Sequence, residues 1–144
     1  FNDKLIGECD EFLSKIIINL ILRRQVMGTL ECKDFSTQAD EVMTPNNAKV
    51  EMVNVGGQRV MKISAKPGWK WSTDIKPVVG TESCQAKHVG VIVEGSITCR
   101  HDDGSEMTYN AGSAYSIEPG HDAWVNGDTT AVAYEFHGVW GEKG

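Results

Sequence analysis

The stretch that decides the fold runs from Ser83 to Gly127 and reads SCQAKHVGVIVEGSITCRHDDGSEMTYNAGSAYSIEPGHDAWVNG. In it, short runs rich in valine, isoleucine and tyrosine alternate with turn sequences. The clearest turn is HDDG at 101–104, because Asp-Gly supports the positive φ that a tight hairpin needs. The same alternation extends outward from Lys49 to His137. Many short strands joined by regular turns predict an antiparallel β-sandwich or barrel.

The turn residues divide this all-β region into expected strands at 49–55, 59–65, 87–93, 96–100, 106–109, 114–117, 123–125 and 131–137. A longer segment, from Trp69 to Gly80, lies between the second and third of these strands. If that segment is extended, Trp69 and Trp71 are two residues apart and share one face.

The last expected strand has two chemically different faces. Val132, Tyr134 and Phe136 alternate along it with Glu135 and His137. We expect the three apolar side chains to face the core, because side chains two apart in a strand lie on one side. Glu135 and His137 should then face solvent, which makes His137 a poor ligand candidate.

Length, charge and cysteine content limit the classes of function. The chain has 144 residues, enough for one domain with a single hydrophobic core. Its formal net charge of −6 argues against nucleic-acid binding and against docking on an anionic membrane, because Lys and Arg are not in excess. The four cysteines, at positions 9, 32, 84 and 99, include no Cys-x-x-Cys pair and show no zinc-ribbon or thioredoxin-type motif. With no sign of secretion, we expect reduced thiols in a cytoplasmic protein.

Residues 1–26 differ in composition from the rest, and we expect a helix at about 2–24. Its apolar run, Phe12–Leu22, is too short to span a bilayer, which needs about 20 residues. The acidic residues before that run do not fit a signal peptide, which begins with positive charge. One hypothesis is that the natural start is Met27, so that the preceding residues are an upstream extension. The other is a helix packed on the barrel or on a second subunit; in both, 27–144 form a single domain.

Two glycine-marked segments carry a family resemblance. HVGVIVEG ends at Gly95, and GSAYSIEPGHDAWVNG begins at Gly112 and contains Gly120. They resemble the two motifs of the cupin superfamily, G-x(5)-H-x-H-x(3,4)-E-x(6)-G and G-x(5)-P-x-G-x(2)-H-x(3)-N. The resemblance covers roughly 50–136 and is best at 83–127. It implies an all-β cupin double-stranded β-helix, or jelly-roll barrel, and a homodimer, since cupins of this size commonly pair.

The usual cupin metal ligands are missing from this sequence. Aligned on Gly95, Glu82 and Cys84 stand at the two usual histidines, and His88 stands at the usual glutamate. Ala123 replaces the last histidine. The resemblance therefore implies the fold, but the standard two-histidine, glutamate, histidine iron site does not carry over.

A different ligand set remains, composed of Cys84, His88 and His121, with Glu82 in reserve. Glu82, Cys84 and His88 are separated by even numbers and so point the same way in an extended strand. A thiolate with imidazoles suits zinc, iron or copper, and three ligands with one open position are what a catalytic metal needs. The alternative is that His88 is a hydrogen-bonded residue inside the barrel, Cys84 a small buried hydrophobe and His121 a turn residue.

A pocket for a small molecule is the second candidate feature. Its expected lining residues are Trp69, Trp71, Asp74, His88, His121 and Trp124. Large aromatic side chains with a polar atom often line such pockets, although core packing is the alternative for the tryptophans. The segment 69–80 looks like an insertion relative to short cupins and could fold over the barrel mouth as a lid.

Two function hypotheses of different class result. The first is a binding or sensing module whose barrel holds a small molecule without chemistry, which the loss of all four usual ligand residues favours. The second is a metal-dependent oxygenase, isomerase or lyase that uses Cys84, His88 and His121. The sequence has no glycine-rich phosphate loop before a helix, and cupins host many chemistries, so the fold does not name the ligand.

Overall fold

The computed structural model describes residues 30–137, and its compact unit begins at Lys33. The expected helix at 2–24, the start-site hypothesis at Met27 and the domain limit after residue 26 lie outside the described residues. The described cysteines, Cys32, Cys84 and Cys99, are free thiols. No helix in this part of the chain is long and apolar enough to cross a membrane.

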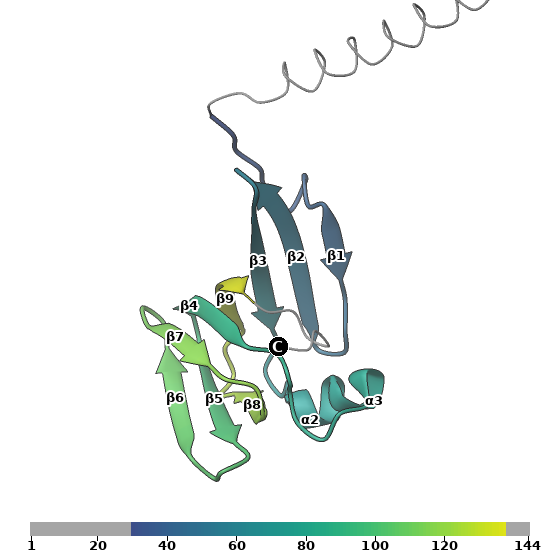
Figure 1. Ribbon diagram of the computed structural model, residues 1–144. Coiled ribbons are helices and arrows are strands. Elements are labelled where there is room, and N and C mark those ends of the chain that lie inside the picture. The colour runs from purple at the N-terminus through teal and green to yellow at the C-terminus, as the bar shows by residue number, and fades with distance from the viewer. Residues whose placement is uncertain (1–29, 138–144) are drawn as a thin grey trace, which may run out of the picture. The chain divides into compact units, whose positions relative to one another are not determined.

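Two antiparallel sheets make up the unit, as Figure 1 shows. Its strands are β1 (Glu41–Met43), β2 (Ala48–Val55), β3 (Gln58–Ala65), β4 (His88–Glu94), β5 (Ser96–His101), β6 (Glu106–Asn110), β7 (Ala114–Ile117), β8 (His121–Val125) and β9 (Ala131–His137). The six-stranded sheet has the order β1-β2-β3-β9-β4-β7, and the three-stranded sheet has the order β6-β5-β8. From β4 onward the chain passes back and forth between the two sheets. This is a jelly-roll arrangement, and it confirms the predicted all-β fold.

The expected strands form, with bounds that move by one or two residues. β8 begins at His121, two residues earlier than predicted, and β1 is a strand that the sequence pattern did not reveal. Gly104 has a φ of 87° in the turn between β5 and β6, as expected for the Asp-Gly hairpin. The prediction of strands therefore succeeded where glycine marked the turns.

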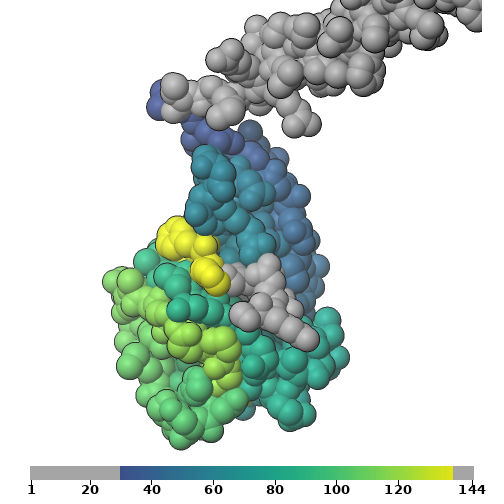
Figure 2. Space-filling model, viewed as in Figure 1, coloured from purple at the N-terminus to yellow at the C-terminus, as the bar shows by residue number. Residues whose placement is uncertain are grey.

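The segment after Trp69 is not extended, so the condition under which Trp69 and Trp71 would share one strand face does not hold. The segment forms two short helices, α2 (Trp71–Asp74) and α3 (Lys76–Val79). Pro77 lies in the first turn of α3, where its missing N–H costs no helical hydrogen bond, and Gly80 ends that helix with a φ of 74°. Helix α2 packs against β8. In the space-filling view of Figure 2, the surface of the three-stranded sheet (green) adjoins that of the helices (teal).

The predicted orientation of β9 is also wrong. Ala131, Ala133 and Glu135 are buried, and Glu135 is only 5% exposed. The side chains predicted to face the core lie on the other side of the strand: Val132, Tyr134 and Phe136. The Phe35 ring covers part of that outer face, with its centroid 5.4 Å from that of Tyr134. His137 is exposed, as predicted.

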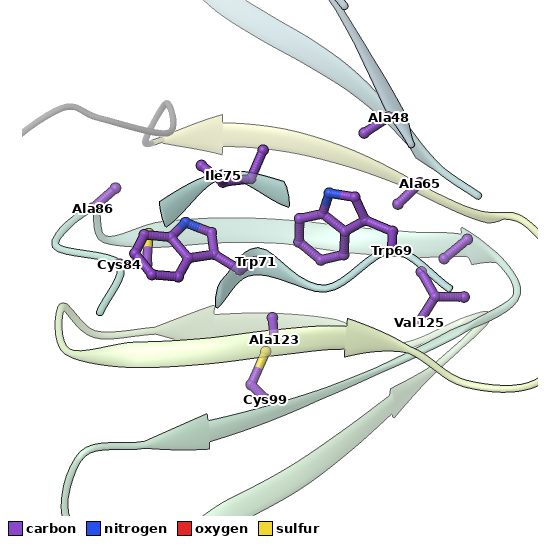
Figure 3. Packing of buried hydrophobic residues seen from close by; sticks show 11 residues of the cluster. Ala48, Ala65, Trp69, Trp71, Ile75, Cys84, Ala86, Cys99, Ala123 and Val125 are labelled. Carbon is purple, nitrogen blue, oxygen red and sulfur yellow. The ribbon is translucent and has the colours of Figure 1, made fainter. Parts of the chain in front are cut away.

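Two tryptophans fill the space between the sheets, as Figure 3 shows. Trp69 and Trp71 are 3% and 1% exposed. Small side chains in the same cluster leave the volume that the indole rings need: Ala48, Ala65, Ala86, Ala123 and Ala131. Because the interior is closely packed, the two large indole rings require small side chains around them, and β9 therefore presents alanines inward.

Candidate metal centre

The structure brings together Cys84, His88 and His121, the three residues that the sequence analysis selected as ligands. One ligand atom of each lies within 4.8 Å of those of the other two. Cys84 is 1% exposed, and both histidines are 3% exposed. The cluster is therefore a buried group of one sulfur and two ring nitrogens, at the place where the sequence predicted a metal.

Backbone pairing fixes where these side chains lie. His88 is the first residue of β4, and His121 is the first residue of β8. Cys84 precedes β4 and forms an isolated bridge with His121, in which the Cys84 N–H donates to the His121 carbonyl over 2.8 Å. The Gly120 N–H donates in return to the Cys84 carbonyl over 2.7 Å. The bridge joins the two sheets at the cluster.

Each histidine has its Nδ1 atom engaged outside the cluster. The Nδ1 atom of His88 lies 2.8 Å from Glu135 Oε2, and that of His121 donates to the Glu118 carbonyl over 2.7 Å. The Nε2 atoms are thereby left for the cluster, and that of His88 lies 3.5 Å from Cys84 Sγ. A carboxylate or carbonyl on the second nitrogen is how proteins orient a metal-binding histidine.

Glu135, which the sequence analysis placed at the surface, extends this network. Its Oε1 atom accepts a hydrogen bond of 2.6 Å from the Tyr115 hydroxyl, while Oε2 faces His88. A Cβ atom at Gly90 would lie 2.9 Å from both Tyr115 Oη and Glu135 Cγ, closer than packing permits. A glycine inside a strand signals such a close approach. The atom nearest to such a Cβ is the backbone carbonyl oxygen of Tyr134, so Gly90 signals the close approach of β9 and does not by itself identify the buried carboxylate.

The charges of the cluster are coupled. Burial opposes the thiolate, but hydrogen bonds from His121 and His88 outweigh it and lower the pKa of Cys84 to about 6. Burial also opposes the imidazolium, but the charge of Glu135 and the hydrogen bond with Cys84 raise the pKa of His88 to about 10. Without a metal, the pair is thus a thiolate beside an imidazolium at neutral pH. By contrast, burial raises the pKa of Cys99 to about 12, so this nearby thiol stays protonated.

The donor set fits a tetrahedral metal ion. Zn–S and Zn–N bonds of about 2.3 and 2.1 Å at a tetrahedral angle separate the two ligand atoms by about 3.6 Å. The observed separation of Cys84 Sγ and His88 Nε2 is 3.5 Å. This one separation is compatible with a tetrahedral site, and the donor set suits zinc, iron or copper.

A small cavity adjoins the cluster. It has a volume of about 40 Å³, and His88, His121 and Glu135 line it together with Trp69 and Trp71. Most of the other walls are apolar: Ile63, Ala65, Ile92, Ile97, Ile117, Ala123 and Ala133. Cys84 is not in the lining, so the thiol closes the cluster on the side away from the cavity.

Three residues predicted for the site lie elsewhere. Glu82 is exposed and pairs with Lys76 over 2.7 Å, so it does not join the cluster. Asp74 is buried, but its carboxylate accepts hydrogen bonds from the side chains of Asn46 and Asn47 and does not line the cavity.

Trp124 also lies outside the cavity lining. Its ring faces two cations instead, with Lys70 Nζ at 5.5 Å and Arg100 Cζ at 5.2 Å from the ring centroid. Alternation along β8 explains this position, because Ala123 and Val125 point into the core and Trp124 points away from it.

Comparison with known proteins gives the fold and no more. No family model matches the chain, and no curated protein matches its sequence. An RmlC-like cupin from Shewanella frigidimarina is similar in structure, with a TM-score of 0.51 and 18% identity over 76% of this chain and 93% of that one. Ectoine synthase from P. lautus is similar with a TM-score of 0.54 and 11% identity, over 78% of this chain and 81% of that one. The chain therefore has the fold of the cupin superfamily, as its glycine-marked motifs predicted.

Proposed function

We propose that this protein binds zinc, iron or copper through Cys84 Sγ, His88 Nε2 and His121 Nε2, and holds a small molecule at the remaining coordination position. The observation that supports this most is the orientation of the histidines. Both have Nδ1 engaged by an oxygen acceptor, and Nε2 of His88 lies at a tetrahedral ligand separation from the sulfur. A histidine in an ordinary core would also have its Nδ1 atom paired, but here the second nitrogen of His88 faces a thiol within a group of three metal-binding side chains.

The position of the cavity favours a reactive metal site over a purely structural one. Structural zinc sites have four protein ligands, whereas catalytic sites keep one position open for water or substrate. Within residues 30–137, three ligand residues gather here, and the cavity borders two of them. The metal-dependent hypothesis is thus better supported than the metal-free binding module.

A metal-free cysteine nucleophile would also have a lowered pKa, but the geometry does not support it. Cys84 is 1% exposed and does not line the cavity, so a molecule in the cavity does not meet its sulfur. A metal ion held between the three ligands, by contrast, would face the cavity through the side of His88 and His121. The low pKa of Cys84 serves coordination, because the thiolate is the form that binds metal.

The test is the metal content of untagged protein purified without chelator or nickel, measured by plasma mass spectrometry. We expect close to one metal ion per chain. His88→Ala should lose the metal, while His137→Ala, which changes an exposed histidine of β9, should retain it. Circular dichroism checks that each variant is folded, and Cys84→Ala provides a second ligand variant if His88→Ala is not. Absence of metal after incubation with each of the three ions would overturn the proposal.

A further inference from the structure

We infer that the site is built for a ligand of two to four non-hydrogen atoms that accepts a hydrogen bond from the indole N–H of Trp71. This inference rests on the proposed metal centre and goes beyond it, because it names the size and the hydrogen-bonding chemistry of what binds there. It is carried by two independent observations, namely the volume of the cavity and an unpartnered buried donor in its wall.

The volume limits the ligand. A cavity needs about 10–15 Å³, measured as here, to hold one water molecule. The cavity beside His88 and His121 measures about 40 Å³, so it holds about three such atoms. A benzene ring or a sugar does not fit, whereas a triatomic anion, formate or acetate does.

Trp71 supplies the donor. Its side chain lines the cavity, the residue is 1% exposed, and among the described residues its Nε1 atom has no hydrogen-bond partner. A buried donor without a partner costs about 1–3 kcal/mol, and buried polar atoms in folded proteins are nearly always paired. Since the indole borders the cavity, we assign an acceptor atom of a molecule inside it as the partner of this N–H.

A second, larger hollow lies beside the cavity. It measures about 290 Å³ and shares four lining residues with the inner cavity: Cys99, Tyr109, Ile117 and His121. The outer hollow has the charged and polar side chains of His101, Glu106 and Glu118 among its lining residues, whereas the inner cavity is mostly apolar. Larger molecules therefore match only the outer hollow, and the smallest ligands match the space beside the cluster.

The experiment uses the full chain loaded with Co²⁺, whose visible absorption reports both the ligands and any added molecule. Formate, acetate, butyrate and benzoate, added at equal ionic strength, keep the carboxylate constant while the size increases. We expect formate and acetate to change the spectrum in a saturable way, and benzoate to have no effect up to a concentration at least a hundredfold higher. This series needs no variant, so it tests the size limit even if substitutions disturb folding.

Trp71→Phe tests the donor, because it keeps an aromatic ring and removes the N–H. The loss of one hydrogen bond predicts a dissociation constant for formate that is about five- to tenfold higher. Trp124→Phe makes the same change at a ring outside the cavity lining and should leave formate binding unchanged.

The outcomes separate the two proposals. If cobalt gives no thiolate-to-metal absorption, or if that absorption survives Cys84→Ala, the metal centre itself is wrong. If the absorption is present but benzoate binds as well as formate, the size limit is wrong. If Trp71→Phe and Trp124→Phe bind formate equally well, the assignment of the donor is wrong.

Discussion

The interior face of the six-stranded sheet has two halves that differ in chemistry. At the buried positions of β2 and β3 it presents apolar side chains, including Met52, Met61 and Ile63, which belong to one cluster. Across β9 and β4 it presents Glu135 and His88, although Glu135 is the direct neighbour of Met61 across the β3–β9 pair. At this pair of neighbouring residues, apolar packing, which has no directional requirement, meets a hydrogen-bond network in which each polar atom needs a partner. Substitutions on the two sides should act on different properties.

The largest effect that we expect is on stability, from the apolar half. Met61 is 1% exposed, and Met61→Ala removes most of a buried side chain, which costs about 2–5 kcal/mol. The free energy of unfolding from urea denaturation measures this loss. Metal content should stay at the wild-type level. Met107→Ala, at a position that is 61% exposed, should change stability little. Metal loss in folded Met61→Ala would show that the halves are not independent.

Glu135→Gln should act on the metal site instead. The change preserves shape but removes the charge that faces Nδ1 of His88. Loss of such a supporting group typically weakens metal affinity by about 10- to 100-fold. Competition with a chromophoric chelator measures the affinity, and Glu94→Gln, at the exposed end of β4, is the matched control. Equal affinities for the two variants would mean that Glu135 does not support the metal site.

The smallest effect concerns pH in the metal-free protein. The lowered pKa of Cys84, from 9.0 to about 6, adds stability that is complete above pH 9 and is lost as the pH falls toward 6. The raised pKa of His88, from 6.5 to about 10, adds stability that is complete below pH 6.5 and is lost as the pH rises toward 10. Between about pH 6.5 and 9 the pair holds one proton in both states, on the thiol when unfolded and on the imidazole when folded. The opposite pH dependences of the two contributions therefore cancel, so the pair should leave the free energy of unfolding independent of pH in this range.

Urea denaturation at several pH values, with chelator present, measures how the free energy of unfolding depends on pH. Cys84→Ala removes the contribution that rises with pH, while the charge of Glu135 still favours a protonated His88. That variant should lose stability as the pH increases from 6.5 to 9. If the free energy of unfolding had the same pH dependence in the variant and in the wild type, the assignment of one proton to the pair, on the imidazole when folded, would be wrong.

The sequence predicted most of the fold because its turns are marked by glycines, which adopt positive φ without the steric cost that other residues meet. Gly95, Gly104, Gly112 and Gly120 all have positive φ, and the strands between them formed where expected. The sequence left the conformation of the segment after Trp69 open and indicated only that its two tryptophans would share a face if the chain were extended. Tertiary packing buries both rings while the chain turns into two short helices.

The three clustered residues could be selected from the sequence, but the groups that hydrogen-bond to them could not. Cys84, His88 and His121 are of metal-binding type, and the motifs placed them at one end of the barrel. Glu135 was assigned to the wrong face because alternation gave the bulky apolar residues of β9 to the core. The interior instead needs small residues beside the tryptophans and one carboxylate beside His88. Which face is interior depends on residues far away in the sequence, and a single strand does not contain that information.

The backbone bridge between Cys84 and His121 has a consequence for motion. The amide hydrogens of Cys84 and Gly120 are hydrogen-bonded across the bridge. They therefore exchange with solvent only when the bridge between the loop before β4 and the start of β8 opens. The same opening would separate two of the proposed ligands. Hydrogen exchange at these two amides and the off-rate of a bound ion should therefore report one event, and a slow exchange rate would mark a centre that keeps its ion over many ligand-binding cycles.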